Sequence, residues 1–247
     1  MTALPPRHEF NAFDQPIGLE VPDWQGAAYP ARVMLEGHFC RIEPLDTTRH
    51  GAALCTAMKE PGAERNWTYM LAGPFVSNED YLAWLTQMAC SSDPLFFAII
   101  DTDSGDAVGV ASYLRIDANN GVIEIGHLNF SPRLQRTPAA TEAMYLLMKH
   151  AFALGYRRYE WKCHALNQPS CNAALRLGFR FEGIFRQAMV LKGRNRDTSW
   201  YSIIDSEWPA CAAAFERWLA KDNFDTEGRQ RHSLAALRAE LTGREPR

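Results

Sequence analysis

The residues best suited to bind a ligand lie at a helix start that directly follows a strand-like run. Thr137-Pro138 is a strong start, with threonine as the N-cap and proline at the first helical position. Free backbone N–H groups and the helix dipole favour anions there, and Arg133 and Arg136 add positive charge. The spacing predicts a phosphate site, which suits a nucleotide-bearing acyl carrier and favours a group-transfer enzyme.

A second group lies further along the chain, in the run NQPSCNAALRLGFRFEG from Asn167 to Gly183. Ser170 is placed to cap a two-turn helix that ends at Gly178, since serine favours the N-cap and glycine the position after the last turn. Such a helix could close a groove beside the phosphate site.

These groups must be positioned by alternating strands and helices. Apolar periodicity and turn residues predict strands over 37–44, 95–100, 107–114, 122–130 and 156–164, followed by a closing hairpin of 185–191 and 198–204. Caps and apolar stripes predict helices over 46–58, 77–88, 137–154, 170–178, 206–220 and 233–241. Residues 1–34, rich in Pro, Gly and Asp, are expected to form an extended arm lying on the body, with Ile17, Val21 and Trp24 as its anchors.

Composition excludes some classes of function. The formal net charge is −3, whereas nucleic-acid binding depends on concentrated positive charge. No apolar run approaches the roughly 20 residues that cross a bilayer, and the polar N-terminus lacks a signal-peptide core, so we expect a cytoplasmic protein without a membrane partner. The six cysteines form no CxxC pair and are expected as free, mostly buried thiols; Cys163-His164 with Cys171 has no zinc spacing, and no metal is expected.

Three runs in this order resemble the GNAT acyltransferase superfamily: EIGHLNFSP, QRTPAA and NQPSCNAALRLGFRFEG. The resemblance covers about residues 37–207 and is closest to the branch of ribosomal-protein N-terminal acetyltransferases. It implies a mixed α/β fold whose mostly antiparallel sheet is splayed between its fourth and fifth strands, with helices on both faces. It also implies one such domain over residues 35–247, including the C-terminal helices, and acetyl-CoA as co-substrate.

The resemblance assigns the pyrophosphate of acetyl-CoA to the loop at Gln135. Pro138 stands where the family usually has glycine and removes one N–H donor. The amides that remain for the phosphates belong to Arg136, Thr137, Ala139 and Ala140. The other residues that the resemblance places around the carrier are Asn129, Phe130, Arg133, Gln135, Thr141 and Asn167.

Transfer of an acetyl group to an amine needs a proton acceptor and a proton donor. Glu124, in a run like the family's EIG, is the candidate base, and its alternative is a cross-strand ion pair on the surface. Ser170 resembles a family serine that donates to the departing thiolate, and its alternative is a simple N-cap. Ala174 stands where many relatives have tyrosine, which leaves Ser170 as the candidate donor.

The remaining expectations concern the thioester carbonyl and the residues around it. A backbone N–H among Asn129 to Ser131 is the candidate for polarising the carbonyl. Alternation places His127 on the sheet face opposite Glu124, as a packed histidine. The polar run Arg186 to Arg196 either contacts a substrate or a partner subunit, or forms solvated ion pairs.

Taken together, the chain is expected to be an acetyl-CoA-dependent N-acetyltransferase that acts by direct transfer. Its acceptor is a primary amine, either a protein N-terminus or a small molecule. The alternatives are a non-catalytic CoA-binding module or sensor and an interaction protein that has lost CoA. A homodimer is possible for this branch.

Overall fold

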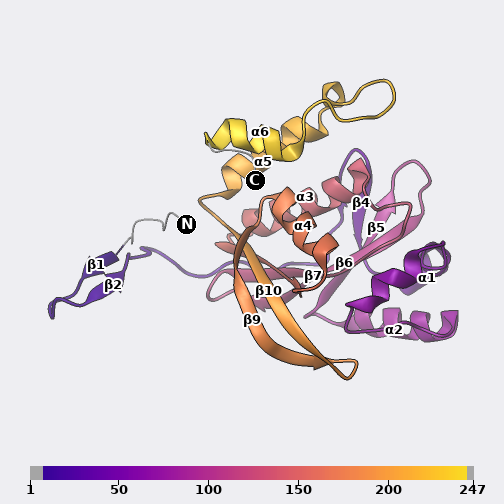
Figure 1. Cartoon of the computed structure of the whole chain (residues 1–247), viewed down its shortest axis with the longest axis horizontal. Coiled ribbons are helices and arrows are strands. Elements are labelled where there is room, and N and C mark those ends of the chain that lie inside the picture. Colours follow the sequence, from indigo (N-terminus) through magenta and orange to yellow (C-terminus); the bar gives the residue numbers. More distant parts are fainter. Residues whose placement is uncertain (1–7, 244–247) are drawn as a thin grey trace.

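The computed structural model describes residues 8–243, in which an eight-stranded sheet forms the centre (Figure 1). Its order is β3-β4-β5-β6-β7-β8-β10-β9, and every neighbouring pair is antiparallel except β7 and β8, which are parallel. The strands are β3 (Leu35–Glu36), β4 (Cys40–Pro44), β5 (Leu95–Asp101), β6 (Ala107–Asp117), β7 (Val122–Phe130), β8 (Arg158–His164), β9 (Arg180–Leu191) and β10 (Arg194–Ile204). The mixed, mostly antiparallel sheet confirms the expected fold class.

Helices cover both faces of the sheet, as expected. The helices are α1 (Thr47–Ala57), α2 (Asn78–Cys90), α3 (Pro138–Ala153), α4 (Gln168–Leu177), α5 (Trp208–Leu219) and α6 (Leu234–Thr242), with 3-10 turns η1 (Ala63–Thr68) and η2 (Lys221–Asn223). One core joins the sheet to α3, α4, α5 and α6, and a second core joins the other face to α1 and α2.

Strand β5 shows why the sheet is covered twice. All residues of the run LFFAII are buried, and they alternate between the two cores. Leu95 and Phe97 join the core under α3, whereas Phe96 and Ala98 join the core under α1 and α2. A strand that is apolar on both faces must be covered on both faces, because successive side chains point to opposite sides.

Local caps largely follow the sequence. Thr137 caps α3, with its hydroxyl accepting the N–H of Ala140 at 3.1 Å, and Pro138 begins the helix. Gly155 follows α3 with φ of +91°, a conformation that glycine adopts without steric cost. The first strand predicted over 37–44 starts only at Cys40, because the preceding residues turn back from β3.

The N-terminal segment has a small hairpin of β1 (His8–Phe10) and β2 (Pro16–Gly18), which projects away from the body (Figure 1). Trp24 anchors the segment, since its Nε1–H donates to Asn119 O at 2.8 Å and the guanidinium of Arg157 lies 5.4 Å from its ring centroid. Ile17 and Val21, the other expected anchors, are exposed. Residues 1–7 of the expected arm and residues 244–247 of the expected domain lie outside the described residues, and the division at residue 34 stays a prediction.

A buried carboxylate ties the start of β4 to α3. Glu142 is 5% exposed, and its oxygens accept the N–H groups of His38 (2.8 Å), Phe39 (2.6 Å) and Cys40 (2.9 Å). A Cβ at Gly37 would collide with this carboxylate, so the turn needs glycine. The α3 helix that carries the predicted phosphate site is therefore fixed to the sheet by hydrogen bonds between the Glu142 carboxylate and the backbone at the start of β4.

We predict that Glu142→Ala destabilises the fold by about 3 kcal/mol or more, because it leaves buried N–H donors without an acceptor. Denaturant unfolding would measure this free energy. Glu240→Ala is the matched control: Glu240 pairs with Arg217 at 3.0 Å, but both side chains are about half exposed, and such pairs contribute at most about 1 kcal/mol. A loss for Glu142→Ala as small as that of the control would contradict the prediction.

Candidate active site

An opening in the sheet lies at its parallel junction. β7 and β8 pair only from Val122↔Arg158 to Ile125↔Trp161, and beyond that point they are not paired with each other. This parting confirms the splay expected between the fourth and fifth strands of the predicted set. Strand backbone that loses its neighbour exposes hydrogen-bonding groups, which makes the opening the natural place for a bound molecule.

A bulge in β7 lies at the opening. Ser112 pairs with Gly126 and Val110 with Asn129, so one residue of β6 faces two residues of β7, and His127 takes a φ of +49°. His127 packs against Phe96 (ring centroids 5.0 Å apart) and its Nδ1 lies 2.8 Å from Ser112 Oγ. His127 is packed, as expected, but the expected face is wrong. The extra residue in β7 shifts the alternation, so the His127 ring lies on the same face of the sheet as Glu124.

Glu124 lies at the end of the paired stretch and belongs to a buried ion cluster. It is 6% exposed, and its Oε2 lies 2.8 Å from Lys162 Nζ and 3.4 Å from Arg115 Nε. Lys162 also contacts Glu160 Oε2 at 3.0 Å and lies 3.6 Å from the centroid of the Trp200 ring. Burial raises the pKa of the Glu124 carboxyl, and Lys162 opposes the rise. A cross-strand ion pair is therefore present, but it is buried and not on the surface.

Ser170 is not the N-cap that the sequence suggested. The cap is Asn167, whose Oδ1 accepts the N–H of Ser170 at 3.3 Å, because the helix starts three residues earlier than expected. The Ser170 hydroxyl instead accepts the indole N–H of Trp161 at 3.1 Å. Accepting this bond does not use the hydroxyl's own proton, which can still be donated, and the Cys163 thiol is one group within its reach.

Glu124 and Ser170 lie on opposite faces of the sheet. Glu124 is paired in register with Glu160, whereas the neighbouring Trp161 points to the other face, towards α4 and Ser170. Only the opening between β7 and β8 connects the two faces next to these residues. A group that contacts both must therefore pass through the parted strands.

The N-terminus of α3 presents unused donors. Among the described residues, the N–H groups of Arg136, Thr137 and Ala139 have no hydrogen-bond acceptor, whereas that of Ala140 is used by the Thr137 hydroxyl. Pro138 has none, and Arg136 has a φ of +64° at the tight turn before the helix. Three outward N–H groups at a helix N-terminus are a suitable cradle for a phosphate.

Several expected side chains around this cradle are held by neighbours. Arg133 Nε lies 3.0 Å from Glu60 Oε1 and its Nη1 lies 3.4 Å from Asp106 Oδ2. The Thr141 hydroxyl accepts from Arg176 at 3.1 Å. Their charges and hydroxyl groups are thus engaged within the protein, and the backbone of the turn remains the direct donor set.

The backbone of Phe130 faces the opening. Ser131 N–H donates to Val108 O at 3.0 Å, so in the alternating pattern of an antiparallel ladder the Phe130 peptide groups point away from β6. Its carbonyl accepts from Asn66 Nδ2 and Gln135 Nε2, each at 2.8 Å. Of the run Asn129 to Ser131, Phe130 thus has the N–H that is directed into the gap.

Three residues at the site were not singled out from the sequence: Asn66, Arg115 and Lys162. Asn66 Nδ2 donates to Asn129 Oδ1 at 2.8 Å, and its position in an irregular segment gives no signal. Lys162 did have a signal in the sequence. The run RYEWKCH alternates charged and apolar residues, which places Lys162 on the same strand face as Glu160.

The described residues offer neither a metal site nor a membrane-spanning helix. Within residues 8–243, no group of three or more His, Cys, Asp and Glu side chains is placed to hold a metal ion. None of the helices described there is long and apolar enough to span a bilayer. Of the six thiols, only that of Cys90 is exposed.

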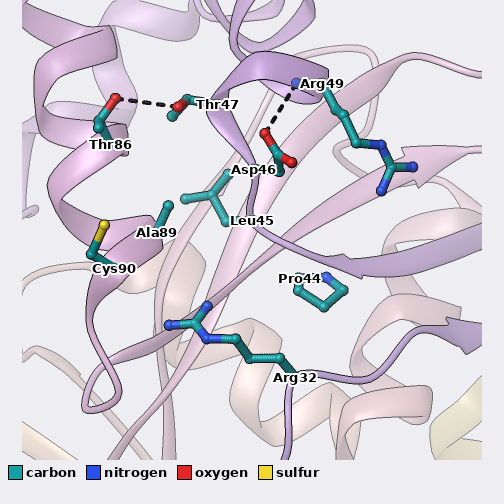
Figure 2. A pocket seen from close by; sticks show the side chains of 9 residues that line it. All are labelled: Arg32, Pro44, Leu45, Asp46, Thr47, Arg49, Thr86, Ala89 and Cys90. Atoms are coloured by element: carbon teal, nitrogen blue, oxygen red, sulfur yellow. Dashed lines mark hydrogen bonds between the residues drawn. The ribbon is translucent and has the colours of Figure 1, made fainter.

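A shallow hollow lies away from the opening, between α1, the end of α2 and the N-terminal segment (Figure 2). Arg32 points towards it from that segment, and Thr86 donates to Thr47 across it at 3.3 Å. The Asp46 carboxylate beside it caps α1 by accepting the N–H groups of Thr48 and Arg49. The hollow is lined by Arg32, Pro44, Leu45, Asp46, Thr47, Arg49, Thr86, Ala89 and Cys90. The Thr86–Thr47 contact joins α2 to α1, and the exposed thiol of Cys90 is the one nucleophilic group in this lining.

Comparison with known proteins places this geometry in context. The acetyltransferase (GNAT) domain profile matches residues 41–180. A GCN5-related N-acetyltransferase from Brucella melitensis has 48% identity and a TM-score of 0.87, over 88% of this chain and 99% of that one. The ribosomal-protein-serine acetyltransferase of Escherichia coli is 35% identical over 104 residues, 41% of this chain and 58% of the relative. The microcin C7 self-immunity acetyltransferase, solved with acetyl-CoA and AMP, shares the fold at 22% identity and a TM-score of 0.60, over 68% of this chain and 93% of that one.

We predict that Lys162→Met raises the pKa of Glu124 further, because it removes the cation that most opposes the effect of burial. When folding raises the pKa of a carboxyl, the protonated form stabilises the folded protein. This stabilisation is complete below the pKa in the unfolded chain, about 4.3, and is lost as the pH rises through the pKa in the folded protein. The stability deficit of Lys162→Met should therefore grow from pH 4 to pH 8, to about 3 kcal/mol.

Thermal and urea unfolding across that pH range would measure the deficit. Lys149→Met is the control, since Lys149 is 59% exposed and 3.9 Å from its carboxylate partner Glu216. A deficit that is constant with pH would show that Lys162 does not tune Glu124.

Proposed function

The chain belongs to the GNAT acetyltransferase family, and on that premise we propose that it moves an acetyl group from acetyl-CoA to a primary amine by direct transfer. Family membership makes the protein an acyltransferase, and the GNAT fold uses acetyl-CoA. The proposal concerns the residues that act and the kind of acceptor.

The observation that carries the proposal is the parting of β7 and β8, with unused N–H donors at one end and Glu124 at the other. The amides of Arg136, Thr137 and Ala139 fit a pyrophosphate, and the Phe130 N–H facing the gap fits a carbonyl. Acetyl-CoA, when bound, supplies an acetyl group activated as a thioester. The open strands let such a chain-like molecule lie between β7 and β8.

Glu124 is the proposed base. The amine must lose a proton to become a nucleophile, and a carboxyl whose pKa is raised towards neutrality accepts a proton better than an ordinary glutamate. Lys162 and Arg115 keep enough positive charge beside it to favour the ionised, proton-accepting form. The proton passes to Glu124 directly or through a water molecule.

Ser170 is the proposed proton donor to the departing thiolate, which leaves as the free thiol of CoA. Its hydroxyl lies on the opposite face from Glu124 and is oriented by the indole N–H of Trp161. Acid and base are then separated by the sheet, so neither can neutralise the other. Asn167 holds the first turn of α4 in place through its cap and acts on the carrier indirectly.

The acceptor is either a protein N-terminus or a small amine. The name of the Escherichia coli relative favours the first, over the part of the chain that aligns. A non-catalytic CoA-binding module is the alternative, because Pro138 removes a donor from the phosphate loop. The homodimer and the cytoplasmic location expected from the sequence stay predictions, and light scattering after gel filtration would decide the first.

We predict that acetyl-CoA and CoA both raise the melting temperature saturably, whereas AMP, which lacks the pyrophosphate, has a much smaller effect. Thermal-shift titration would measure this. Pro138→Gly restores an N–H donor and should tighten CoA binding by up to about tenfold, the value of one charged hydrogen bond. The absence of any shift with acetyl-CoA would reject the cofactor site.

We predict that Glu124→Gln lowers kcat by on the order of a hundredfold and removes the rise of kcat/KM with pH that a single basic carboxylate produces. Steady-state kinetics between pH 5 and pH 9 with a panel of amines would test it. Glu182→Gln is the control, because Glu182 lies at the outer end of the same face and is paired with Arg158 at 2.8 Å. Equal losses in the two variants would remove Glu124 from the mechanism.

A further inference from the structure

Arg196 on β10 is a cation without an anionic partner. Its side chain is half-buried, and no carboxylate of the described residues lies within ion-pair distance. Its Nη1 reaches Tyr69 O at 3.4 Å, which is long for a hydrogen bond, and its Nε is buried with no partner at all. Burial lowers the pKa of the Arg196 guanidinium. A desolvated cation that is left unpaired is costly, so a bound anion is the expected partner of Arg196.

The position of Arg196 is next to the opening, on the face of Glu124. Trp200 pairs with Lys162 and Thr198 with His164, so alternation along β10 puts Arg196 on the same face, just past the end of β8. Turn η1 and Tyr69, which follows it, connect this region to β7: Asn66 binds the Asn129 side chain, and the Tyr69 ring lies 5.1 Å from that of His164. Arg196 and Glu124 thus lie on one face of the sheet, on either side of the opening.

A second unused donor lies on β7, at the other side of the opening. Asn129 has 0% exposure, its Oδ1 accepts from Asn66, and its Nδ2 has no partner. Buried N–H groups in proteins are nearly always paired with an acceptor, from the protein or from something bound. Asn129 and Arg196 thus both have N–H donors that lack an oxygen acceptor, and the acceptor at Arg196 should carry a negative charge.

The carrier does not supply this anion at Arg196. In the proposed function, its phosphates lie at the amides of Arg136, Thr137 and Ala139, at the start of α3, and the part within the opening is uncharged. Arg196 is also not needed to hold the β9–β10 hairpin against η1, because Lys192 already makes that connection. The Lys192 Nζ donates to Trp67 O at 2.6 Å. The remaining source of an anion is the acceptor itself.

We propose that the acceptor is a small primary amine that carries a carboxylate or a phosphate, and that Arg196 binds this anionic group while Glu124 takes the proton from the amine. The inference rests on the proposed function. The planar guanidinium suits both groups, because its N–H donors match two oxygens at once. A protein N-terminus offers a neutral peptide carbonyl at the same place and leaves the charge of Arg196 uncompensated.

The test compares matched acceptors that differ only in the anionic group. They are α-amino acids against their carboxamides, O-phosphoethanolamine against ethanolamine, and an uncharged tripeptide amide. We expect the wild-type kcat/KM to favour one anionic class by at least about tenfold, the value of a charged hydrogen bond. Whichever pair shows the preference identifies the group. Arg196→Gln should collapse the ratio through KM, and Arg196→Lys should keep part of it.

Arg194→Gln is the matched control, since Arg194 is exposed on the same strand, and it should leave the ratio unchanged. Equal use of charged and uncharged partners, preference for the tripeptide amide, or equal loss on both partners in Arg196→Gln would overturn the inference.

If acetyl-CoA binds but no amine is acetylated, the proposed function fails while the anion site is still decided by thermal shift with N-acetylglycine and with N-acetyl-O-phosphoethanolamine. Stabilisation by either compound that depends on Arg196 would support the site, and stabilisation that is absent with both or the same in Arg196→Gln would overturn it.

Discussion

The structure depends on the point where β7 and β8 stop pairing. Up to Ile125 and Trp161 they form the only parallel pair in the described sheet, and beyond it their backbones need other partners. Asn66 and Gln135 supply some by binding the Phe130 carbonyl. The bulge at His127 shifts the alternation of β7 at the same place. Turn η1, helix α4 and the β9–β10 hairpin are therefore arranged around a gap that the sheet cannot close by itself.

Charged side chains form a continuous chain of ion pairs on the sheet face that carries Glu124. Alternating charges extend across it from Glu182 through Arg158, Glu160 and Lys162 to Glu124, each within hydrogen-bond distance of the next. Buried ion pairs rarely add much net stability, because desolvation offsets their attraction. Their value here lies in holding one carboxylate at the edge of the gap, in a setting where burial raises its pKa. Arg196 lies outside this chain of pairs, and in our proposal its charge binds the anionic group of the acceptor.

Sequence patterns predicted the elements better than the contacts of the site. The cap at Thr137, the proline that follows it and the buried run of β5 are local signals, because each depends on neighbours within a turn or on strict alternation. Ser170 shows the limit of such signals. Serine and asparagine are both good N-caps. Asn167 is the cap because β8 ends at His164 and α4 begins directly after Asn167.

By itself, the sequence determined the order of the main strands and helices, the start of α3 at Thr137 and the family, because these follow from periodicity, caps and short motifs. Tertiary structure decided what the charged side chains face. Glu124 is buried because strands distant in the sequence bring Lys162 and Trp200 against it, and His127 changes face because of one extra residue in a ladder. Register, bulges and ion pairing depend on partners far along the chain, and no local pattern specifies them.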